Sequence, residues 1–509
     1  MKYTCIDPVE FLYPDITDYK SGTEQINILT PRGSYACAQI LLFEGNGSIE
    51  VKCEGWKPEV YEMIAIPVEA SPVYSWGGKG EPHTPERKAP FEVYDCLKPS
   101  GGKIAFQDGV AAVYFSMWIP QDATPEIINA TVEVGEISIP VKIEISIAVV
   151  PEESLSVLMA YSENNICQYH KVERNSTDFK RLDAEYLLMM RRMRQNGLEI
   201  PCFPAVKVLG ENQYEFDFSD TEAYISKAES VGFNKFSQFL GYKGEGPHLY
   251  LHGLEKPAIS YEGYCYLAQH LCALKEFIAQ HGLENRYLLA ICDEPSKDIS
   301  MEYRALCGIV RKFWSDVTMF NALNCSDCVE GSIDICVPMI PEYDRHMKEY
   351  DTYRIYDEEL WYYDCMGPRG DGYINRFMDY TLLATRYHGW GNYKYDMKGY
   401  HHWAVNRYLG GQNPFKNSCT MQDNETELPA GDTHIVYPGE NGPWMSVRLE
   451  NYRAGFEEYE MLRVLAQKDK KLADDICASV FRSFKDVEYD PLTFRSVRNV
   501  LIRAMEEVG

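Results

Sequence analysis

Residues 287–295 constrain the fold of this chain more than any other stretch of its sequence. They form an apolar run, Tyr-Leu-Leu-Ala-Ile-Cys, that ends abruptly in Asp293, Glu294 and Pro295. Such a run is typical of a strand that is covered on both faces, as in a parallel sheet. Pro295 disfavours helical backbone at Glu294, so we expect the chain to stay extended there. The carboxyl end of a buried strand therefore carries two adjacent acids.

Adjacent side chains on a strand point to opposite faces of the sheet. Asp293 and Glu294 can therefore converge on one ligand only where the regular pleat ends. The alternative is a solvated Asp-Glu-Pro turn that follows a core strand. The rest of the chain favours a site.

Composition limits the possible partners. The chain has 509 residues, which suggests two or three domains, and a formal charge of −26. That charge disfavours nucleic acids and anionic membranes, which are bound by clustered Lys and Arg, and favours a neutral ligand. We find no apolar stretch long enough for a transmembrane helix. Asp7, Pro8 and Glu10 stand where a secretory signal needs an apolar core, so we expect a cytoplasmic protein.

The 16 cysteines do not predict a metal site. Many of them lie in apolar runs, which is typical of buried, reduced thiols. The close pair Cys325 and Cys328 has no second pair and no His partner at metal-binding spacing. We therefore expect no bound metal.

The pattern along the chain predicts three segments. Residues 1–151 alternate strand and turn signals, which predicts a β-sandwich. Residues 152–412 alternate strands with helices, which predicts a (β/α)8 barrel. Residues 413–509 contain a polar segment with a short strand at 431–439, followed by helices that we expect to pack on the barrel.

Eight barrel strands are expected, and Asp293 and Glu294 end the fourth of them. Active sites of this fold lie at the carboxyl ends of the strands, which is where the two acids fall. The other seven strands are predicted at 155–161, 198–206, 233–240, 317–322, 333–340, 359–365 and 399–406, and helices at 177–196, 220–231, 260–282 and 374–387.

Two carboxylates in contact cannot both remain ionised comfortably, so one is held protonated while the other keeps its charge. In ordinary glycosidases two acids about 5 Å or more apart flank the sugar, a geometry that is awkward for sequence neighbours. Adjacent acids suit a substrate that supplies its own nucleophile, the acetamido oxygen of an N-acetylhexosamine. Our hypothesis is that Asp293 orients the acetamido group and that Glu294 is the acid/base.

Aromatic and amide side chains at predicted strand ends could bind a sugar. Trp361 and Tyr363 share one face of the seventh strand, Trp403 lies in the eighth, and Asn321 lies near the end of the fifth. Core packing is the alternative for each aromatic side chain. Their concentration at strand ends favours a binding pocket.

Several motifs together resemble the catalytic domain of glycoside hydrolase family 123. In chain order they are Asp293-Glu294-Pro295, Leu-Trp-Tyr-Tyr-Asp-Cys at 360–365, Tyr-His-His-Trp-Ala-Val-Asn at 400–406, Gly-Asp-Thr-His-Ile-Val-Tyr-Pro-Gly at 431–439 and Ser-Val-Arg-Leu-Glu-Asn-Tyr-Arg-Ala-Gly at 446–455. The N-terminal segment is similar to the accessory domain of that family, through residues 93–97 and 118–123.

The resemblance implies a retaining exo-β-N-acetylgalactosaminidase that works by substrate-assisted catalysis, with Asp293 and Glu294 as its acid pair. It implies a carbohydrate substrate and no metal or organic cofactor. Neither nucleic acid nor membrane is an expected partner.

Two rival readings stay open from the residues. One is a two-carboxylate glycosidase for sugars without an acetamido group, in which Glu294 works with Asp364 or Glu342. The other is a catalytically inactive, carbohydrate-binding barrel. The intact pair of acids argues against the second.

Overall fold

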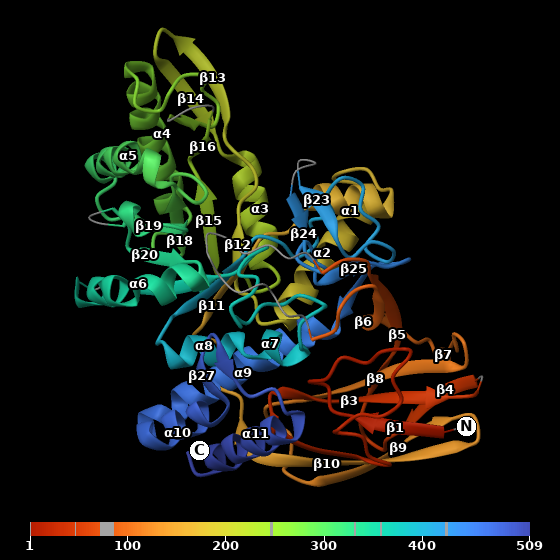
Figure 1. Cartoon of the computed structure of the whole chain (residues 1–509). Helices are drawn as coiled ribbons and strands as arrows, with labels where there is room; N and C mark the ends of the chain where they lie inside the picture. The colour runs from red at the N-terminus through yellow and green to blue at the C-terminus, as the bar shows by residue number, and fades with distance from the viewer. Residues whose placement is uncertain are drawn as a thin grey trace.

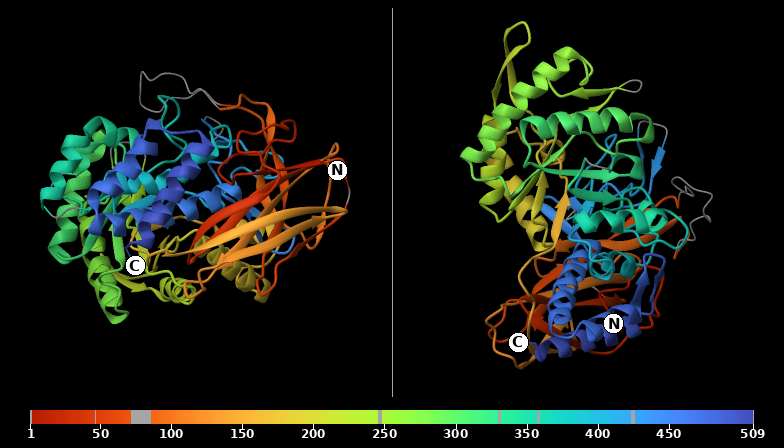
Figure 2. Two further views of the ribbon diagram at one scale, coloured as in Figure 1. Left: turned by 90° about the horizontal axis from the view of Figure 1, so that it is seen from below. Right: turned by 90° about the vertical axis from the view of Figure 1, so that its left-hand side faces the viewer.

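The computed structural model describes residues 2–45, 47–71, 86–244, 248–329, 332–356, 359–422 and 426–508. An N-terminal β-sandwich lies beside a closed parallel barrel, and C-terminal helices lie against both (Figure 1). The left view of Figure 2 shows these helices in blue between the green barrel and the orange sandwich. The predicted fold class is confirmed, whereas the boundaries at 151 and 412 stay predictions.

The sandwich consists of two sheets whose inward side chains form one apolar core. Alternating residues of β10, such as Ile139, Val141 and Ile143, are buried against the facing sheet. The larger sheet has the order β1 (Lys2–Ile6), β3 (Ser34–Phe43), β8 (Val110–Ile119), β5 (Glu59–Val68), β6 (Phe91–Pro99), β26 (Pro443–Ser446) and β25 (Val436–Pro438). The smaller has the order β2 (Ile26–Arg32), β10 (Ile137–Val149), β9 (Ile127–Val134), β4 (Gly47–Lys52) and β7 (Lys103–Ile104).

The barrel contains all eight predicted strands, and they pair in parallel in chain order. They are β11 (Ser156–Met159), β12 (Gly197–Glu199), β15 (Lys235–Phe239), β18 (Tyr287–Ala290), β19 (Thr318–Leu323), β20 (Ile335–Pro338), β21 (Glu359–Tyr363) and β22 (Gly399–His402). The acid pair follows β18, the fourth strand, as predicted. Side chains such as Phe320, Val337 and Trp361 fill the barrel interior.

Helices cover the outside of the barrel. They are α1 (Glu163–His170), α2 (Thr177–Arg192), α3 (Ser219–Glu229), α4 (Tyr261–Gln280), α5 (Ser300–Phe313) and α6 (Ile340–Tyr353). Short hairpins project from the loops: β13 (Ala205–Gly210) with β14 (Gln213–Asp217), β16 (Gly241–Lys243) with β17 (Leu249–Leu251), and β23 (Thr420–Gln422) with β24 (Thr426–Leu428). Among the helices that the structure describes, none is both long enough and apolar enough to cross a membrane.

The helix predicted at 374–387 is wrong. Residues 374–381 form a loop, and only the short helices α7 (Leu382–Arg386) and α8 (His388–Lys394) follow it. The amide of Asn375 donates to the carbonyls of Cys365 and Pro368, at 3.2 and 3.1 Å. The apolar spacing in this loop reflects burial of an irregular segment and not a helix face.

The C-terminal segment joins the barrel to the sandwich. β26 pairs with β6, so two late strands extend the N-terminal sheet, a pairing that the sequence did not predict. Helix α9 (Val447–Lys468) packs on α7 and α8, and α11 (Pro491–Glu506) packs on β10 of the sandwich. Between α9 and α11 lie helix α10 (Lys470–Val480) and the hairpin of β27 (Phe481–Ser483) and β28 (Asp486–Val487).

Arg448 of α9 lies at the centre of this junction and is fully buried. Its Nε and Nη2 atoms donate to the carboxylate of Asp95 on β6, at 3.0 and 2.9 Å. Its remaining donors reach the carbonyls of Gly431 and His434, at 2.8 and 2.9 Å. A Cβ on Gly431 would lie 2.6 Å from Nη1, so only glycine allows this close approach.

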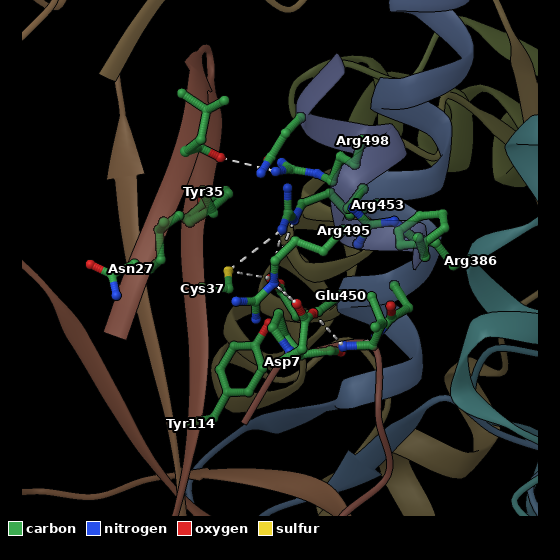
Figure 3. A pocket seen from close by; sticks show the side chains of 18 residues that line it. Asp7, Asn27, Tyr35, Cys37, Tyr114, Arg386, Glu450, Arg453, Arg495 and Arg498 are labelled. Carbon is green, nitrogen blue, oxygen red and sulfur yellow. Dashed lines mark hydrogen bonds and ion pairs between the residues drawn. The ribbon is translucent and has the colours of Figure 1, made fainter. Parts of the chain in front are cut away.

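A second charged cluster fills the gap between the sandwich and α9. Figure 3 shows the residues that line a cavity here, with arginines from α7, α9 and α11 and residues of β2, β3 and β8. The volume of the cavity is about 80 Å³. Arg453 donates to Glu457 at 2.8 Å and to Glu450 at 3.1 Å, and Arg498 donates to Glu458 at 3.0 Å. The same cluster reaches the sandwich, because Arg498 donates to the carbonyl of Leu29 at 3.0 Å and Glu457 accepts from the Ser34 hydroxyl at 2.6 Å. The cluster therefore joins the C-terminal helices to the sandwich.

We expect Arg448→Met to lower the free energy of unfolding by about 3–5 kcal/mol, because it leaves the Asp95 carboxylate buried without its partner. Urea denaturation followed by circular dichroism would measure the loss. Lys471→Met is the matched control, since Lys471 and Asp475 form an exposed pair and its loss should not change the midpoint measurably. Equal midpoints for the two variants would contradict this role of Arg448.

Candidate active site

The backbone at the acid pair departs from our expectation. Glu294 has a φ of +40°, in the left-handed region, and is not extended. Pro295 does exclude helical backbone at Glu294, but the chain escapes to the left-handed side instead. Such a conformation costs on the order of 1–3 kcal/mol in a residue with a side chain. The pleat therefore ends at the pair, as convergence of the two acids requires.

Three side chains hold this strained turn in place. Lys243 of β16 donates from Nζ to the carbonyl of Glu294, at 3.0 Å. The thiols of Cys325 and Cys328 donate to the carbonyl of Pro295, at 3.3 and 3.6 Å. All 16 cysteines are free thiols. In the described part of the chain, no group of three or more His, Cys, Asp or Glu residues is arranged to hold a metal ion.

Different neighbours act on the pKa of Asp293 and on the pKa of Glu294. The protein around Glu294 and the negative charge of Asp293 raise the pKa of Glu294, while a hydrogen bond from the Tyr363 hydroxyl to its Oε1 opposes that shift. Burial also raises the pKa of Asp293, although its side chain opens to solvent, and the charges of Lys243 and Arg407 oppose the rise. Both members of this coupled pair therefore hold a proton to higher pH than free carboxyl groups do.

A third acid lies near the pair and was missed in the sequence. Glu199 ends β12, and its Oε1 atom lies 4.0 Å from Nη2 of Arg407. Burial raises the pKa of Glu199, Arg407 opposes the rise and Asp293 adds to it. The position of Glu199 at a strand end, two residues before Pro201, was the signal that could have found it.

Trp403 is half-buried and is held by an acid from a later loop. Its indole Nε1 donates to Oδ1 of Asp432, at 3.3 Å. Asp432 is fully buried, and burial raises its pKa to about 6. Trp403 follows β22 directly, so Asp432 holds this indole at the carboxyl end of the eighth strand.

Two of the proposed sugar-binding residues are not brought to the acids. Trp361 is fully buried in the barrel interior, where its ring packs on Phe320 and its Nε1 donates to Glu359 at the start of β21. Asn321 faces away from the barrel axis, because its neighbours Phe320 and Ala322 face inward. Core packing and local hydrogen bonding account for both residues.

The two acids of the rival reading are occupied elsewhere. Asp364 is fully buried, and burial by itself would raise its pKa. Its pKa is nevertheless below the usual value, because Nε2 of His388 lies 2.8 Å from Oδ2 and the Tyr400 hydroxyl donates to Oδ1. Glu342 is buried on α6, and its Oε1 atom lies 4.0 Å from Nε2 of His346. Neither carboxylate is among the groups that shift the pKa of Glu294.

Two adjacent acids after the fourth strand lie at the carboxyl end of a closed parallel barrel, where the active sites of this fold occur. Residues 161–465 match the family model described as Glycoside hydrolase 123, catalytic domain. The chain belongs to this family, and the resemblance of its motifs is confirmed. Among curated proteins, none matches this sequence.

A solved structure of a family 123 enzyme shows the same fold. A family 123 glycoside hydrolase from Clostridium perfringens has a TM-score of 0.75 and 14% identity, over 99% of this chain and 97% of that chain. An FMN-binding β-glucuronidase from Facaelibacterium prausnitzii has a TM-score of 0.34 and 10% identity, over 84% and 60% of the two chains. A β-D-glucuronidase from Dictyoglomus thermophilum has a TM-score of 0.36 and 10% identity, over 89% and 97%.

We expect Tyr363→Phe to move the alkaline limb of the kcat/KM profile to higher pH. The hydroxyl stabilises ionised Glu294, so its loss raises the pKa of Glu294 further and keeps the acid protonated at higher pH. Initial rates on an aryl β-N-acetylhexosaminide across pH would measure the shift. An unchanged limb, or one displaced to lower pH, would rule out Glu294 as the acid that Tyr363 tunes.

Phenylalanine substitutions should separate the two tryptophans. Trp361→Phe should cost about 1–3 kcal/mol of stability, because it opens a cavity in the barrel interior, and should leave KM unchanged. Trp403→Phe should raise KM roughly 3–10-fold with a smaller loss of stability, because the indole loses its anchor on Asp432. Urea denaturation and steady-state kinetics would measure both. A raised KM for Trp361→Phe, together with a larger loss of stability for Trp403→Phe, would contradict these roles.

Proposed function

We propose that this family 123 glycoside hydrolase releases terminal β-linked N-acetylhexosamine, with N-acetylgalactosamine preferred, by retaining, substrate-assisted catalysis. The observation that carries the proposal is the adjacent acid pair at the end of β18, in which the pKa of both acids is raised. In the proposed mechanism Glu294 carries the proton and Asp293 the negative charge. The related enzyme from Clostridium perfringens hydrolyses glycolipid glycans, which supports a glycan as the substrate here.

In the first step, the acetamido carbonyl oxygen of the substrate attacks the anomeric carbon. Asp293 accepts the hydrogen bond of the acetamido N–H and stabilises the positive charge that develops on the oxazolinium ring. Glu294 donates its proton to the glycosidic oxygen, so the leaving alcohol departs neutral. The left-handed backbone at Glu294 ends the alternation of side chains along the strand, which supports convergence of the two acids on one sugar.

In the second step, Glu294, now ionised, takes a proton from water. That water attacks the anomeric carbon from the side that the leaving group vacated, and the ring bond to the acetamido oxygen breaks. Two inversions give retention of configuration, and Glu294 regains its proton. Lys243 and Arg407 are the positive charges that keep Asp293 anionic through both steps.

A two-carboxylate mechanism is the second candidate, and Glu199 is the residue that favours it. Glu199 is close enough to Asp293 for their charges to interact, and it lies on a different strand of the barrel. A nucleophile from another strand could flank a sugar in the ordinary way. Such an enzyme would not require an acetamido group.

Rates on aryl β-glycosides of GalNAc, GlcNAc, galactose and glucose would decide between the two. We expect turnover of the two acetamido sugars alone, together with inhibition by a thiazoline analogue of the oxazolinium ring. Glu294→Gln should lower kcat by about 10²–10⁴-fold on poor leaving groups, and less on activated aryl groups that need no proton. Asp293→Asn should lower kcat on all leaving groups.

Asp298→Asn is the matched control, since Asp298 is an exposed acid in the short 3-10 helix after the pair (Lys297–Ile299), and this variant should retain full activity. Comparable turnover of aryl galactoside, combined with inactivation by Glu199→Gln, would replace the proposal with the two-carboxylate mechanism. Near-full activity of both acid-pair variants would place the chemistry elsewhere.

A further inference from the structure

A groove of about 1040 Å³ opens between α2 and α3 and is bordered by α1. Its wall includes Tyr161, Cys202 and Arg407, which follow the barrel strands β11, β12 and β22. The groove therefore begins at the carboxyl ends of these strands, the same end of the barrel that carries the acid pair.

Arg407 connects this groove to the acids. It lines the groove, lies 4.0 Å from Glu199, and is one of the two cations whose charge acts on Asp293. A substrate whose terminal sugar reached Asp293 could therefore extend past Arg407 into the groove without leaving the protein surface.

The inner wall of the groove is polar, and its charges are already paired. Nζ of Lys227 lies 2.7 Å from Oδ2 of Asp183 and also bonds Glu163. The hydroxyl of Tyr161 donates to Asp183 at 2.9 Å. Because two acids neutralise the charge of Lys227, this wall offers little attraction for a phosphate or another anion.

The outer wall offers hydrogen-bonding groups that reach solvent. Asn164, Asn175 and Lys180 are exposed and line the groove, and small Ala223 on α3 leaves space beside them. A large cleft with balanced charges and several amide groups is suited to a neutral ligand that is rich in hydroxyl groups.

We propose that this groove binds the neutral saccharide on the reducing side of the bond that is cleaved. Its volume lies at the upper end for pockets that hold small ligands, so it accommodates more than one sugar unit. The inference rests on the proposed glycosidase function for its role, but binding of a saccharide in the groove is measurable without any turnover.

A single bulky substitution would test the groove. Ala223→Trp fills it from α3, and Ser226→Trp places the same side chain at an exposed position of the same helix, outside the groove lining. The probes are lactose, as a neutral disaccharide, an aryl β-N-acetylgalactosaminide, and lactose extended by a terminal β-linked N-acetylgalactosamine. Calorimetry or ligand-observed NMR would measure lactose binding, and steady-state kinetics the two glycosides.

We expect Ala223→Trp to weaken lactose binding and to lower kcat/KM on the extended glycoside by about tenfold or more, with the aryl glycoside unchanged. Ser226→Trp should match the wild type in every assay. Lactose binding that is absent in the wild type or unaffected by Ala223→Trp would overturn the inference, as would equal losses on both glycosides. If the wild type cleaved neither glycoside, the proposed function would fail, while the lactose measurement would still decide the groove.

Discussion

The buried pair of Arg448 and Asp95 joins the N-terminal sandwich to the C-terminal segment of this protein. Removing two charges from water is costly, and the cost is offset here because every side of the guanidinium meets a carboxylate or a carbonyl oxygen. The pair links β6 of the sandwich to α9 and to the loop around Gly431. That loop carries Asp432, which holds Trp403 at the barrel mouth. The sandwich is therefore mechanically connected to the candidate active site.

At the acid pair, in contrast, features that are locally unfavourable in free energy are kept in the folded protein. Glu294 combines a left-handed backbone with a raised pKa, and each is a free-energy cost to the folded chain. Lys243, Cys325 and Tyr363 reach this one segment from three different elements and hold it. Strain that is supported from several sides is a feature of pre-organised sites.

Much of the barrel could be predicted, because most of its strands are short, largely apolar runs at the spacing of a strand-and-helix alternation. The loop at 374–381 misled the same reasoning. Its apolar residues are buried by tertiary contacts, and Asn375 satisfies backbone carbonyls that a helix would have satisfied internally. Periodicity reports burial, and burial does not require a helix.

The sequence by itself determined the order of the strands, the position of the acids after the fourth, and the family. These depend on local signals, namely apolar runs, a proline after two acids, and short motifs. Which aromatic side chains lie at the carboxyl end of the barrel, and which lie in its interior, depends on tertiary contacts. Trp361 and Trp403 look alike in sequence, but the side-chain alternation of β21 turns the first into the barrel, and Asp432 holds the second at its rim. The roles of Glu199 and Arg407 likewise depend on contacts between distant strands, which no local pattern encodes.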